Sequence, residues 1–470
     1  MKNLFKKTAA KSVETTDKRR RITSAQVIPV SFLIVILAGT LLLLLPFSTA
    51  EGEHTDFLTA LFTSTTSVCV TGLVVVDTYL HWTLFGKIVI LILIQLGGLG
   101  MISVTSIIML IAHKKFSLGM TVMLHDSFNL NSLSGLMRFL VRVFKGTLIV
   151  EGLGALLYMP VFIPEFGIVK GIWYSIFTSI SAFCNAGIDI IGPDSLIGYN
   201  SNPAVMFTTI LMIVMGGLGY IVWFDILSGF RYGIKQRFSL VQIYKRFSEH
   251  TKLVLTLTLI LIFGGAAVIF LTEYSNPLTI GEMPLGDKIL NSVFQSVTFR
   301  TAGFASVPQQ FLREGTCAFG DILMFIGGSP VGTAGGIKTV TFFAVILNAV
   351  SYIRNRNEAV VYNRRFSPDT IRKAAAVMTV SFFVSFVMLF LLMISSDVSL
   401  TDGLFEVLSA TCTVGLTRGL TPTLGIAGRI IIIISMYLGR IGPISMALFF
   451  TSKRNDKNKV KHIAGGFIVG

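Results

Sequence analysis

Four glycines recur at nearly equal intervals, each at the end of a short polar stretch rich in serine and threonine. They are Gly72 in SVCVTGL, Gly187 in SAFCNAGI, Gly303 in SVTFRTAGF and Gly415 in SATCTVGL, and they are separated by 115, 116 and 112 residues. A cation that loses its water shell needs oxygen atoms at fixed distances, which backbone carbonyls can supply. Glycine permits the extended or left-handed backbone that turns carbonyls toward a common axis. The spacing therefore predicts four equivalent backbone segments around one axis, as in an ion filter.

The predicted ion-binding atoms are the backbone carbonyl oxygens of the three residues that end at each glycine. These residues are Val70, Thr71 and Gly72; Asn185, Ala186 and Gly187; Thr301, Ala302 and Gly303; and Thr413, Val414 and Gly415. One such segment alone could be an ordinary loop turn, but chance does not produce four in the same register. A single glycine per segment predicts fewer well-defined ion sites than a filter built on TVGYG.

The composition indicates a membrane protein. Hydrophobic residues make up 53% of the chain and charged residues 13%, a balance that soluble domains of this length do not show. Several apolar runs reach the roughly 20 residues that a helix needs to cross a bilayer. They include 27–47, 88–112, 204–224, 253–272 and 374–394. The sequence therefore predicts an all-α polytopic membrane protein.

The net charge of +15 is explained by membrane topology. Lys and Arg gather at both ends of the chain and in alternate loops, whereas Asp and Glu lie mostly in the other loops. This positive-inside pattern predicts cytoplasmic termini and an even number of spans. No nucleic-acid partner is needed to explain the charge, and anionic lipid is an additional partner that it would suit.

Each glycine belongs to a longer repeated unit, which reads as an apolar helix, a helix too short to span, the glycine segment and a second apolar helix. The short helices are expected at 55–67, 170–182, 286–298 and 401–411. Such re-entrant segments are tolerated only inside protein or beside a water-filled cavity. We therefore expect pseudo-fourfold symmetry around one pore and eight transmembrane helices. The predicted organisation is a basic cytoplasmic N-terminus (1–24), four repeats (25–112, 139–232, 251–352 and 368–452) and a cytoplasmic tail (453–470).

The second apolar helix of each repeat carries a glycine signature, and its third copy is interrupted. The copies read QLGGLGM, VMGGLGY, FIGGSPV and YLGRIGP, and the third continues as GGSPVGTAGGIKT over 327–339. So many glycines and a proline do not remain helical in an apolar environment unless the backbone finds other partners. We expect an intramembrane loop that closes the pore, although a kink for helix packing is the alternative. The residues assigned to this gate are Gly327, Gly328, Ser329, Pro330, Gly332, Thr333, Gly335, Gly336, Lys338 and Arg440.

Several charged residues fall within or beside apolar segments. Arg440 replaces the second glycine of the signature, and a charge at that depth faces a cavity or a partner, so we expect an electrostatic barrier below the filter. Arg300 is expected to brace the filter through hydrogen bonds, with Glu406 as its acidic counterpart. Lys338 faces an aqueous cavity or extends to the cytoplasmic interface, and the sequence favours neither. Glu151 is interpreted as a packed structural residue, with a place beside the conduction path as the alternative.

Cysteines stand three residues before three of the four glycines. Cys69, Cys184 and Cys412 hold this position, and Arg300 takes it in the third repeat. Four cysteines in all are too few for a disulfide scaffold, and a metal site would need more ligands nearby. We interpret these cysteines as small buried residues that pack behind the glycine segments.

These motifs resemble those of a known family. SVTFRTAGF, the loop over 327–339, YLGRIGP and the fourfold glycine repeat are similar to the Trk/Ktr/HKT superfamily of potassium transporters, over about residues 20–470. The short N-terminus and the final IVG resemble the Ktr-type membrane subunit. The resemblance implies potassium uptake through a pore in each protomer of a homodimer in the bacterial plasma membrane. It also assigns the gate to loop 327–339 and Arg440.

The resemblance further implies a partner and an ion. A cytoplasmic ring of nucleotide-binding (RCK) regulatory subunits would open the gate, so a nucleotide is expected on that partner and no cofactor in this chain. Potassium is the substrate and the only metal expected, bound at the filter. In plant relatives a serine at the first filter glycine accompanies sodium permeation, so Gly72 implies a preference for potassium, while sodium dependence is left open. The pair Cys412–Thr413 departs from the family pattern, in which a smaller residue is expected.

Two other classes of function fit the sequence less well. A secondary transporter of an organic solute would need a midplane pocket and a rocking repeat, which four parallel repeats with re-entrant helices fit poorly. A membrane subunit of a redox enzyme would need paired haem ligands inside the membrane. All six histidines fall in loops or at helix ends, so we do not expect an enzyme.

Overall fold

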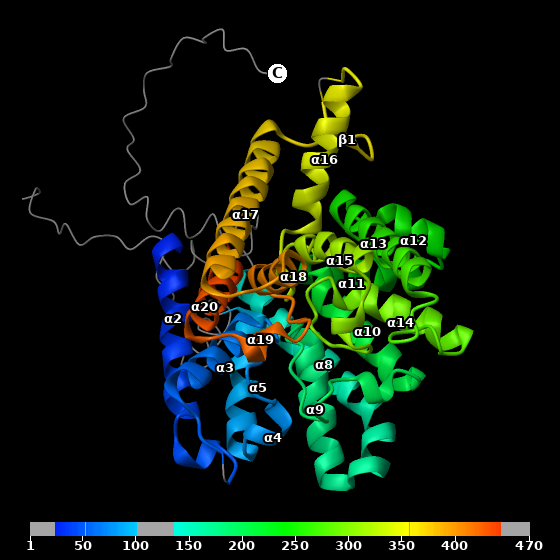
Figure 1. The fold of residues 1–470 in the computed structure, drawn as a ribbon. Coiled ribbons are helices and arrows are strands. Elements are labelled where there is room, and N and C mark those ends of the chain that lie inside the picture. The colour runs from blue at the N-terminus through cyan, green and yellow to red at the C-terminus, as the bar shows by residue number, and fades with distance from the viewer. Residues whose placement is uncertain (1–23, 52, 101–135, 357, 443–470) are drawn as a thin grey trace, which may run out of the picture.

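Helices make up nearly all of the regular structure (Figure 1) in the computed structural model, which describes residues 24–51, 53–100, 136–356 and 358–442. A small hairpin of β1 (Val360–Val361) and β2 (Arg364–Arg365) connects α16 to α17. The predicted tail, nearly all of the predicted N-terminal segment and the ends of the first and fourth predicted repeats lie outside the described residues.

Each quarter of the chain contains one of the four short helices, which follows a longer helix and precedes one or more further helices. The first quarter contains α2 (Ser24–Leu43), η1 (Pro46–Ser48), α3 (Phe57–Cys69), α4 (Thr78–His81) and α5 (Leu84–Leu99). The second contains α8 (Leu136–Phe166), α9 (Ile168–Cys184), η2 (Ile197–Tyr199), α10 (Pro203–Leu218), α11 (Tyr220–Lys235) and α12 (Leu240–Arg246). The third contains α13 (Glu249–Glu273), α14 (Leu285–Thr298), η3 (Gln309–Phe311), α15 (Glu314–Phe325) and α16 (Thr339–Ile353). The fourth contains α17 (Pro368–Ser395), α18 (Leu400–Thr411), α19 (Leu420–Thr423) and α20 (Ile426–Ile441).

Within the described ranges, three helices are long and apolar enough to cross a membrane, judged by length and composition. They are Phe139–Phe166, Glu249–Glu273 and Pro368–Ser395, and the bent pair α10 and α11 is a fourth if it counts as one span. Other apolar helices, such as α5, are shorter, and α5 and α20 each end one residue before the described residues stop. The count of eight transmembrane helices therefore stays a prediction.

The second apolar helix of the second repeat, expected around the apolar run 204–224, is not continuous, so the prediction of a single helix there is wrong. α10 and α11 meet at an angle of 101° across Gly219, whose φ is 86°. Gly100 and Gly442 hold the same place in the glycine signature, directly after α5 and α20, with φ of 82° and 89°. A left-handed glycine is a common helix stop. The last glycine of the signature therefore ends the helix in all three copies that retain it.

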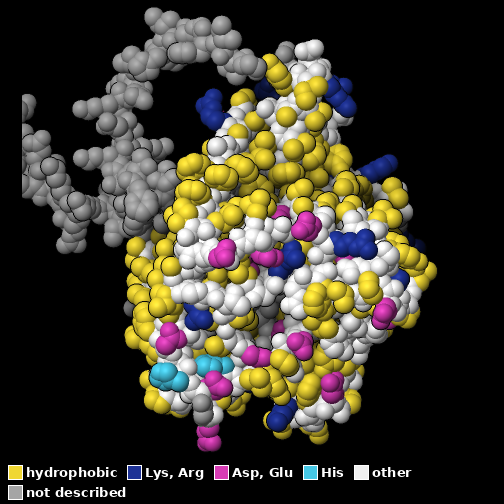
Figure 2. Space-filling model, in the orientation of Figure 1, with side chains coloured by type: hydrophobic (Ala, Val, Ile, Leu, Met, Phe, Trp, Pro, Cys, Tyr) yellow, Lys and Arg dark blue, Asp and Glu magenta, His cyan; other side chains and the backbone are white. Residues whose placement is uncertain are grey.

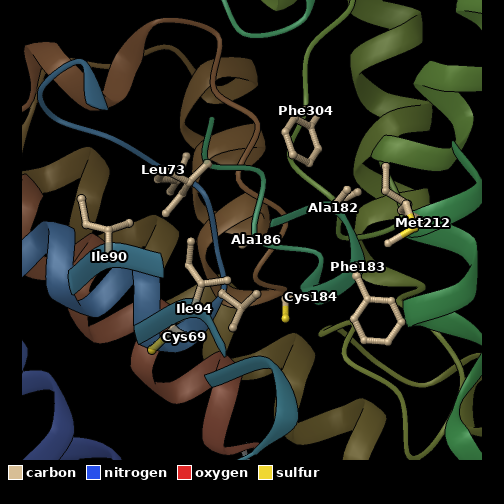
Figure 3. Close-up of a cluster of buried hydrophobic side chains, with 14 of the residues drawn as sticks. Cys69, Leu73, Ile90, Ile94, Ala182, Phe183, Cys184, Ala186, Met212 and Phe304 are labelled. Carbon is tan, nitrogen blue, oxygen red and sulfur yellow. The ribbon is translucent and has the colours of Figure 1, made fainter. Parts of the chain in front are cut away.

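The core of the molecule is built around the four short helices. Each of them buries at least one phenylalanine completely: Phe62 in α3, Phe177 and Phe183 in α9, Phe294 in α14 and Phe405 in α18. Figure 3 shows part of the cluster around two of these helices, with Ile90 and Ile94 on one side and Phe183 and Met212 on the other. Burying one such side chain stabilises the fold by roughly 1.5–3 kcal/mol. This packing anchors the short helices in the core.

Glycines in three of the long helices allow close contact with the short helices. A Cβ atom at Gly39, Gly154 or Gly265 would meet a serine hydroxyl of the short helix that follows: Ser64, Ser179 or Ser296. Those hydroxyls donate to the carbonyls of Ile36, Glu151 and Ile262, each three residues before the glycine. The outer faces of the long helices carry exposed hydrophobic side chains, such as Ile34 and Phe386, and Figure 2 shows such side chains over much of the visible face.

Candidate ion-binding site

The four short helices end at one place with the same backbone turn. The residue two before each glycine is left-handed: Val70 (φ 54°), Asn185 (φ 60°), Thr301 (φ 66°) and Thr413 (φ 52°). The glycines themselves also have positive φ: Gly72 (104°), Gly187 (64°), Gly303 (87°) and Gly415 (97°). Two positive φ values within three residues reverse the direction of the chain and present successive carbonyls to one side. The predicted equivalence of the four segments is present in their local geometry.

The four glycines form a closed ring. A Cβ atom on Gly72 would lie 3.3 Å from the Cα of Gly187 and 3.2 Å from that of Gly415. A Cβ atom on Gly303 would lie 2.9 Å from the Cα of Gly187 and 3.4 Å from that of Gly415. The carbonyl before each glycine also approaches the glycine of the neighbouring segment, as Ala186 O approaches Gly72 and Val414 O approaches Gly303. Because no side chain fits at these positions, only backbone atoms line the ring.

Hydroxyl groups hold the turns that follow the short helices. The backbone N–H of Gly72 donates to Thr66 Oγ1 at 3.0 Å, and that of Gly415 donates to Ser409 Oγ at 3.0 Å. In the second segment Ser181 Oγ accepts from Ile188 N at 3.1 Å. These hydroxyls satisfy N–H groups that the turn would otherwise leave without a partner. The serine and threonine content that marked these segments in the sequence is therefore needed to fold them.

The turn of the third segment differs from the other three in its backbone hydrogen bond. In the first, second and fourth segments the N–H before the glycine bonds to a carbonyl five residues back, as Thr71 N bonds to Thr66 O at 2.9 Å. In the third, Ala302 N bonds to Thr298 O, four residues back, at 3.0 Å. Thr298 Oγ1 then donates to Phe304 O at 2.6 Å. Arg300 lies within this tighter turn, two residues after the end of α14.

The ring favours a cation electrostatically. The C-terminal ends of the four short helices carry partial negative charge and point toward it. Threonine and asparagine side chains of the ring segments are buried without a hydrogen-bond partner among the described residues: Thr71, Asn185, Thr301 and Thr413. Buried polar atoms of this kind normally bind water or an ion.

At the far end of α3 the carboxyl of Asp56 accepts from Thr59 N at 3.2 Å. Burial alone would raise the pKa of Asp56, but hydrogen bonds from Thr59 and the charge of Arg429 hold that pKa below its usual range.

The first glycine of the signature brings the second long helix against the end of a short helix. A Cβ atom at Gly97, Gly216 or Gly439 would strike the carbonyl oxygen of the residue four before a ring glycine: Val68, Phe183 or Thr411. In the third copy, Gly327 lies instead against Gly335 of its own loop. The signature therefore lets α5, α10 and α20 pack directly against the ends of short helices. The third copy differs because a loop fills that space.

The predicted gate is a non-helical loop between α15 and α16. Two hydrogen bonds hold the two ends of the loop together: Gly327 N donates to Ile337 O at 2.9 Å, and Ile337 N donates to Phe325 O at 3.2 Å. Val331 and Gly336 have positive φ, 62° and 64°, where the chain turns. The prediction that this stretch leaves the helix is confirmed.

The middle of the loop bonds to the end of α10. Ser329 N donates to Gly217 O at 2.9 Å, and Thr333 N donates to Gly216 O at 3.1 Å. Two further loop residues contact the last turn of α10 and the residue after it: Gly332 lies against Gly216, and Pro330 O lies against Gly219. Tyr220 N of α11 donates to Val331 O, and within the loop Thr339 N donates to Gly328 O. The bend of 101° between α10 and α11 gives the loop these carbonyl and N–H partners. Its backbone is thus satisfied without helical bonds.

The loop also touches the ring segments from one side. Thr333 Oγ1 donates to Phe183 O at 2.9 Å, at the end of α9. A Cβ atom on Gly335 would strike Thr413 Oγ1 of the fourth ring segment. Lys338, which the sequence left open, folds back onto its own loop, with Nζ 2.6 Å from Ala334 O.

Arg440 joins the loop to the first quarter of the chain. Its Nη1 donates to Thr333 O at 2.8 Å and its Nη2 donates to Gly97 O. It therefore spans from α20 to both α5 and the loop. These contacts place Arg440 beside the loop to which it was assigned as part of the gate, and its role as an electrostatic barrier below the filter stays a prediction.

Arg300 and Glu406 were predicted to be a pair, and the structure does not bring them together. Glu406 is buried in α18 and accepts from Thr417 Oγ1 at 2.7 Å and from Thr421 Oγ1. Arg300 is 8% exposed and has no hydrogen-bond or ion-pair partner among the described residues. Glu406 thus holds the chain that follows the fourth ring segment, through hydrogen bonds from two hydroxyls instead of an ion pair with an arginine.

Gln95 is a residue of the site that sequence reasoning missed. Its Nε2 lies 3.0 and 3.1 Å from the two carboxyl oxygens of Glu151, and Cys184 Sγ lies 3.6 Å from its Oε1. This cluster connects α5, α8 and the end of α9 behind the second ring segment. Its signal was the polar first letter of QLGGLGM, the only polar residue at that position in the four copies. The structural interpretation of Glu151 fits this placement.

The fold and the site define a class of membrane protein that carries cations. A family model described as "TrkH: Cation transport protein" matches residues 3–461. The chain therefore belongs to the TrkH family of cation transporters, which is not an enzyme class. The resemblance read from the motifs is confirmed.

Similar proteins agree over nearly the full length. The chain is 37% identical to the "Ktr system potassium uptake protein B" of Bacillus subtilis, over 96% of this chain and 97% of that protein. It is 36% identical to the "Potassium/sodium uptake protein NtpJ" of Enterococcus hirae, over 93% of this chain and 95% of that protein. Its fold resembles the crystal structure of the potassium transporter TrkH from Vibrio parahaemolyticus, with a TM-score of 0.73, 15% identity and coverage of 93% and 86%.

Proposed function

We propose that this chain is the ion-translocating subunit of a potassium uptake system in a bacterial plasma membrane. The observation that carries the proposal is the closed ring of Gly72, Gly187, Gly303 and Gly415, lined by backbone carbonyls at the ends of four short helices. Potassium is the substrate, and the carbonyls of the four three-residue segments bind it after it loses water. The names of the Bacillus subtilis and Enterococcus hirae proteins support potassium, and the second also brings in sodium.

The loop over 327–339 is the gate in this proposal. Its contacts with the end of α10, with Phe183 and with Arg440 support a plug on the inner side of the ring. The alternative of a packing kink is less suitable, since a kink does not need a loop that bonds to three other elements. Arg440 adds a positive charge beside the path, which opposes a cation while the loop is in place.

The wider assembly is part of the same proposal. Four repeats with eight transmembrane helices place both termini in the cytoplasm, in accordance with the distribution of Lys and Arg. A homodimer and a cytoplasmic ring of nucleotide-binding RCK subunits complete the system, and the "Ktr system" in the relatives' names supports a multi-component assembly. The nucleotide belongs to that partner.

Growth and flux test the proposal together. The gene is expressed in a bacterium that lacks potassium uptake, and growth is measured at low external potassium with and without sodium. We expect rescue in at least one medium, and the difference between the media reports the role of sodium. Purified protein in liposomes should pass potassium down its gradient without any organic solute. Protein that is present in the membrane but supports neither growth nor flux would contradict the proposal, and flux that requires an organic solute would favour a secondary transporter.

A further inference from the structure

A small cavity lies beside the ring, between α10, α13 and α14. Its volume is about 20 Å³, above the roughly 10–15 Å³ that one water molecule needs. Asn185 of the second ring segment and Gly328 of the loop both line it, together with Thr258 and Arg300. The cavity therefore touches both the predicted filter and the predicted gate.

The three polar side chains in its wall are buried and lack partners among the described residues. Arg300 is 8% exposed, Thr258 6% and Asn185 1%. The atoms without a hydrogen bond are Nε of Arg300, Oγ1 of Thr258, and both Nδ2 and Oδ1 of Asn185. Buried polar atoms are nearly always hydrogen-bonded in folded proteins, to protein or to a bound molecule. Three that line one cavity indicate that a molecule occupies it.

The charge of Arg300 distinguishes this cavity from an ordinary water site. Within the described part of the chain no carboxylate forms an ion pair with it, and Glu406 is bonded to threonines instead. Arg440, the other arginine at the ring, donates to two carbonyls and so has its charge partly compensated. An unpaired buried charge is costly. Arg300 also stands three residues before Gly303, where its charge would repel a cation in the ring.

The packing at the boundary between the second and third segments differs from that between the first and second. Between the first and second segments, a Cβ atom on Gly98 would lie 2.5 Å from Cys184 Sγ, so the thiol fills the gap. At the next boundary, a Cβ atom on Gly217 would meet nothing closer than 3.8 Å. Arg300 takes the place that a cysteine holds in the other segments, so no thiol lies within 4 Å of a Cβ atom at Gly217.

We propose that this cavity binds one small monovalent anion, of the size and charge of chloride, paired with Arg300 behind the ring. The guanidinium, the amide of Asn185 and the hydroxyl of Thr258 can all donate hydrogen bonds to it. Water would satisfy some of these donors but would leave the charge of Arg300 uncompensated. An anion satisfies the donors and also removes the repulsion of a cation in the ring. The site does not depend on which cation the protein transports.

Thermal unfolding of the purified full-length protein tests this site without any transport assay. Potassium is kept constant in detergent solution while gluconate, which is too large for the cavity, is replaced by chloride. We expect the unfolding midpoint to rise with chloride and to saturate, as ligand binding to the folded state requires. Thr258→Val, which removes one hydrogen bond to a charged group, should raise the half-saturating chloride concentration by about tenfold. Arg300→Gln should abolish the chloride effect.

The matched control is Arg372→Gln, which removes an arginine whose side chain is 83% exposed and should keep the full response. Crystals of the wild-type protein soaked in bromide should show an anomalous peak in the cavity, and this readout does not require any variant to fold. The proposal is overturned by a midpoint that is equal in chloride and gluconate, by a chloride effect that Arg300→Gln retains, or by a cavity that holds only water after the bromide soak.

Discussion

Nη1 of Arg440 lies 2.8 Å from the carbonyl oxygen of Thr333, so an arginine of α20 is bonded to the backbone of a loop 107 positions earlier in the chain. The same guanidinium donates to Gly97 O in α5. Two rigid helices are thereby linked to one non-helical segment. Hydrogen bonds from a charged group are among the stronger ones in proteins, so this link favours the loop position that the structure shows.

Loss of the Arg440 link should release the loop. We expect Arg440→Ala to raise potassium flux in the absence of the regulatory partner, because each hydrogen bond from a charged donor contributes about 1.5–3 kcal/mol. Loss of one such bond shifts a closed–open equilibrium by roughly tenfold or more. Flux into liposomes measures it. Arg429→Ala is the matched control, since Arg429 lies in the same helix but bonds to Leu424 O at its other end; equal flux in the two variants would contradict a gating role.

The hydroxyl of Thr333 makes a separate prediction for the other side of the loop. Thr333 Oγ1 bonds to Phe183 O at 2.9 Å, which links the loop to the second ring segment. Thr333→Val keeps the shape but loses about 1 kcal/mol of hydrogen bonding, so resting flux should rise by about fivefold. Thr333→Ser keeps the hydroxyl and should behave as wild type. If the valine and serine variants have the same resting flux, the hydroxyl does not hold the loop.

The repeated glycines made much of this site predictable. Their spacing located the ends of all four short helices to within two residues. This was possible because an apolar helix followed by a polar segment and a glycine is a local pattern, which does not depend on tertiary contacts. The extended loop over 327–339 was equally clear, since its glycines and proline are incompatible with a helix. What the sequence conveyed was local backbone geometry.

The partners of charged groups were not predictable in the same way. Arg300 and Glu406 carry opposite charges and lie near the ring in the sequence, yet Glu406 is satisfied by Thr417 and Thr421. The bend at Gly219 was also missed, because it depends on the loop that bonds to the end of α10. Such features follow from which elements meet in space, and a pattern along one chain does not specify that.

The ring itself should not tolerate a methyl group. A Cβ atom on Gly415 would strike the carbonyl oxygen of Thr71, and the φ of 97° is unfavourable for alanine. Gly415→Ala should therefore reduce potassium uptake by about tenfold or more, since overpacking of this kind costs about 1–3 kcal/mol. Growth at low potassium and liposome flux both measure the loss. Gly264→Ala in α13 is the control, because its Cβ would meet nothing within 4 Å; uptake by Gly415→Ala at the level of this control would exclude the ring as the ion path.

The pair of Gln95 and Glu151 should stabilise the wall behind the second ring segment. Replacing either residue by leucine leaves the other, a buried carboxyl or a half-buried amide, without its partner. This costs about 1–3 kcal/mol, so Glu151→Leu and Gln95→Leu should each lower the free energy of unfolding in mixed micelles. The double variant should lose less than the sum of the two single variants, because they remove the same contact.

The matched control for this double-mutant cycle pairs Gln95 with Tyr158, which does not bond to it. Tyr158 lies two helical turns beyond Glu151 in α8, and its hydroxyl is 2.7 Å from Thr209 Oγ1. Because it shares no hydrogen-bond partner with Gln95, the losses of Gln95→Leu and Tyr158→Phe should add to within about 0.5 kcal/mol. A sum that is equally additive for Gln95→Leu and Glu151→Leu would mean that the amide and the carboxyl do not interact in the folded protein. In that case the hydrogen bond from Ser179 Oγ to Glu151 O and the packing of Cys184 against Gly98 would hold the end of α9 in position at the ring.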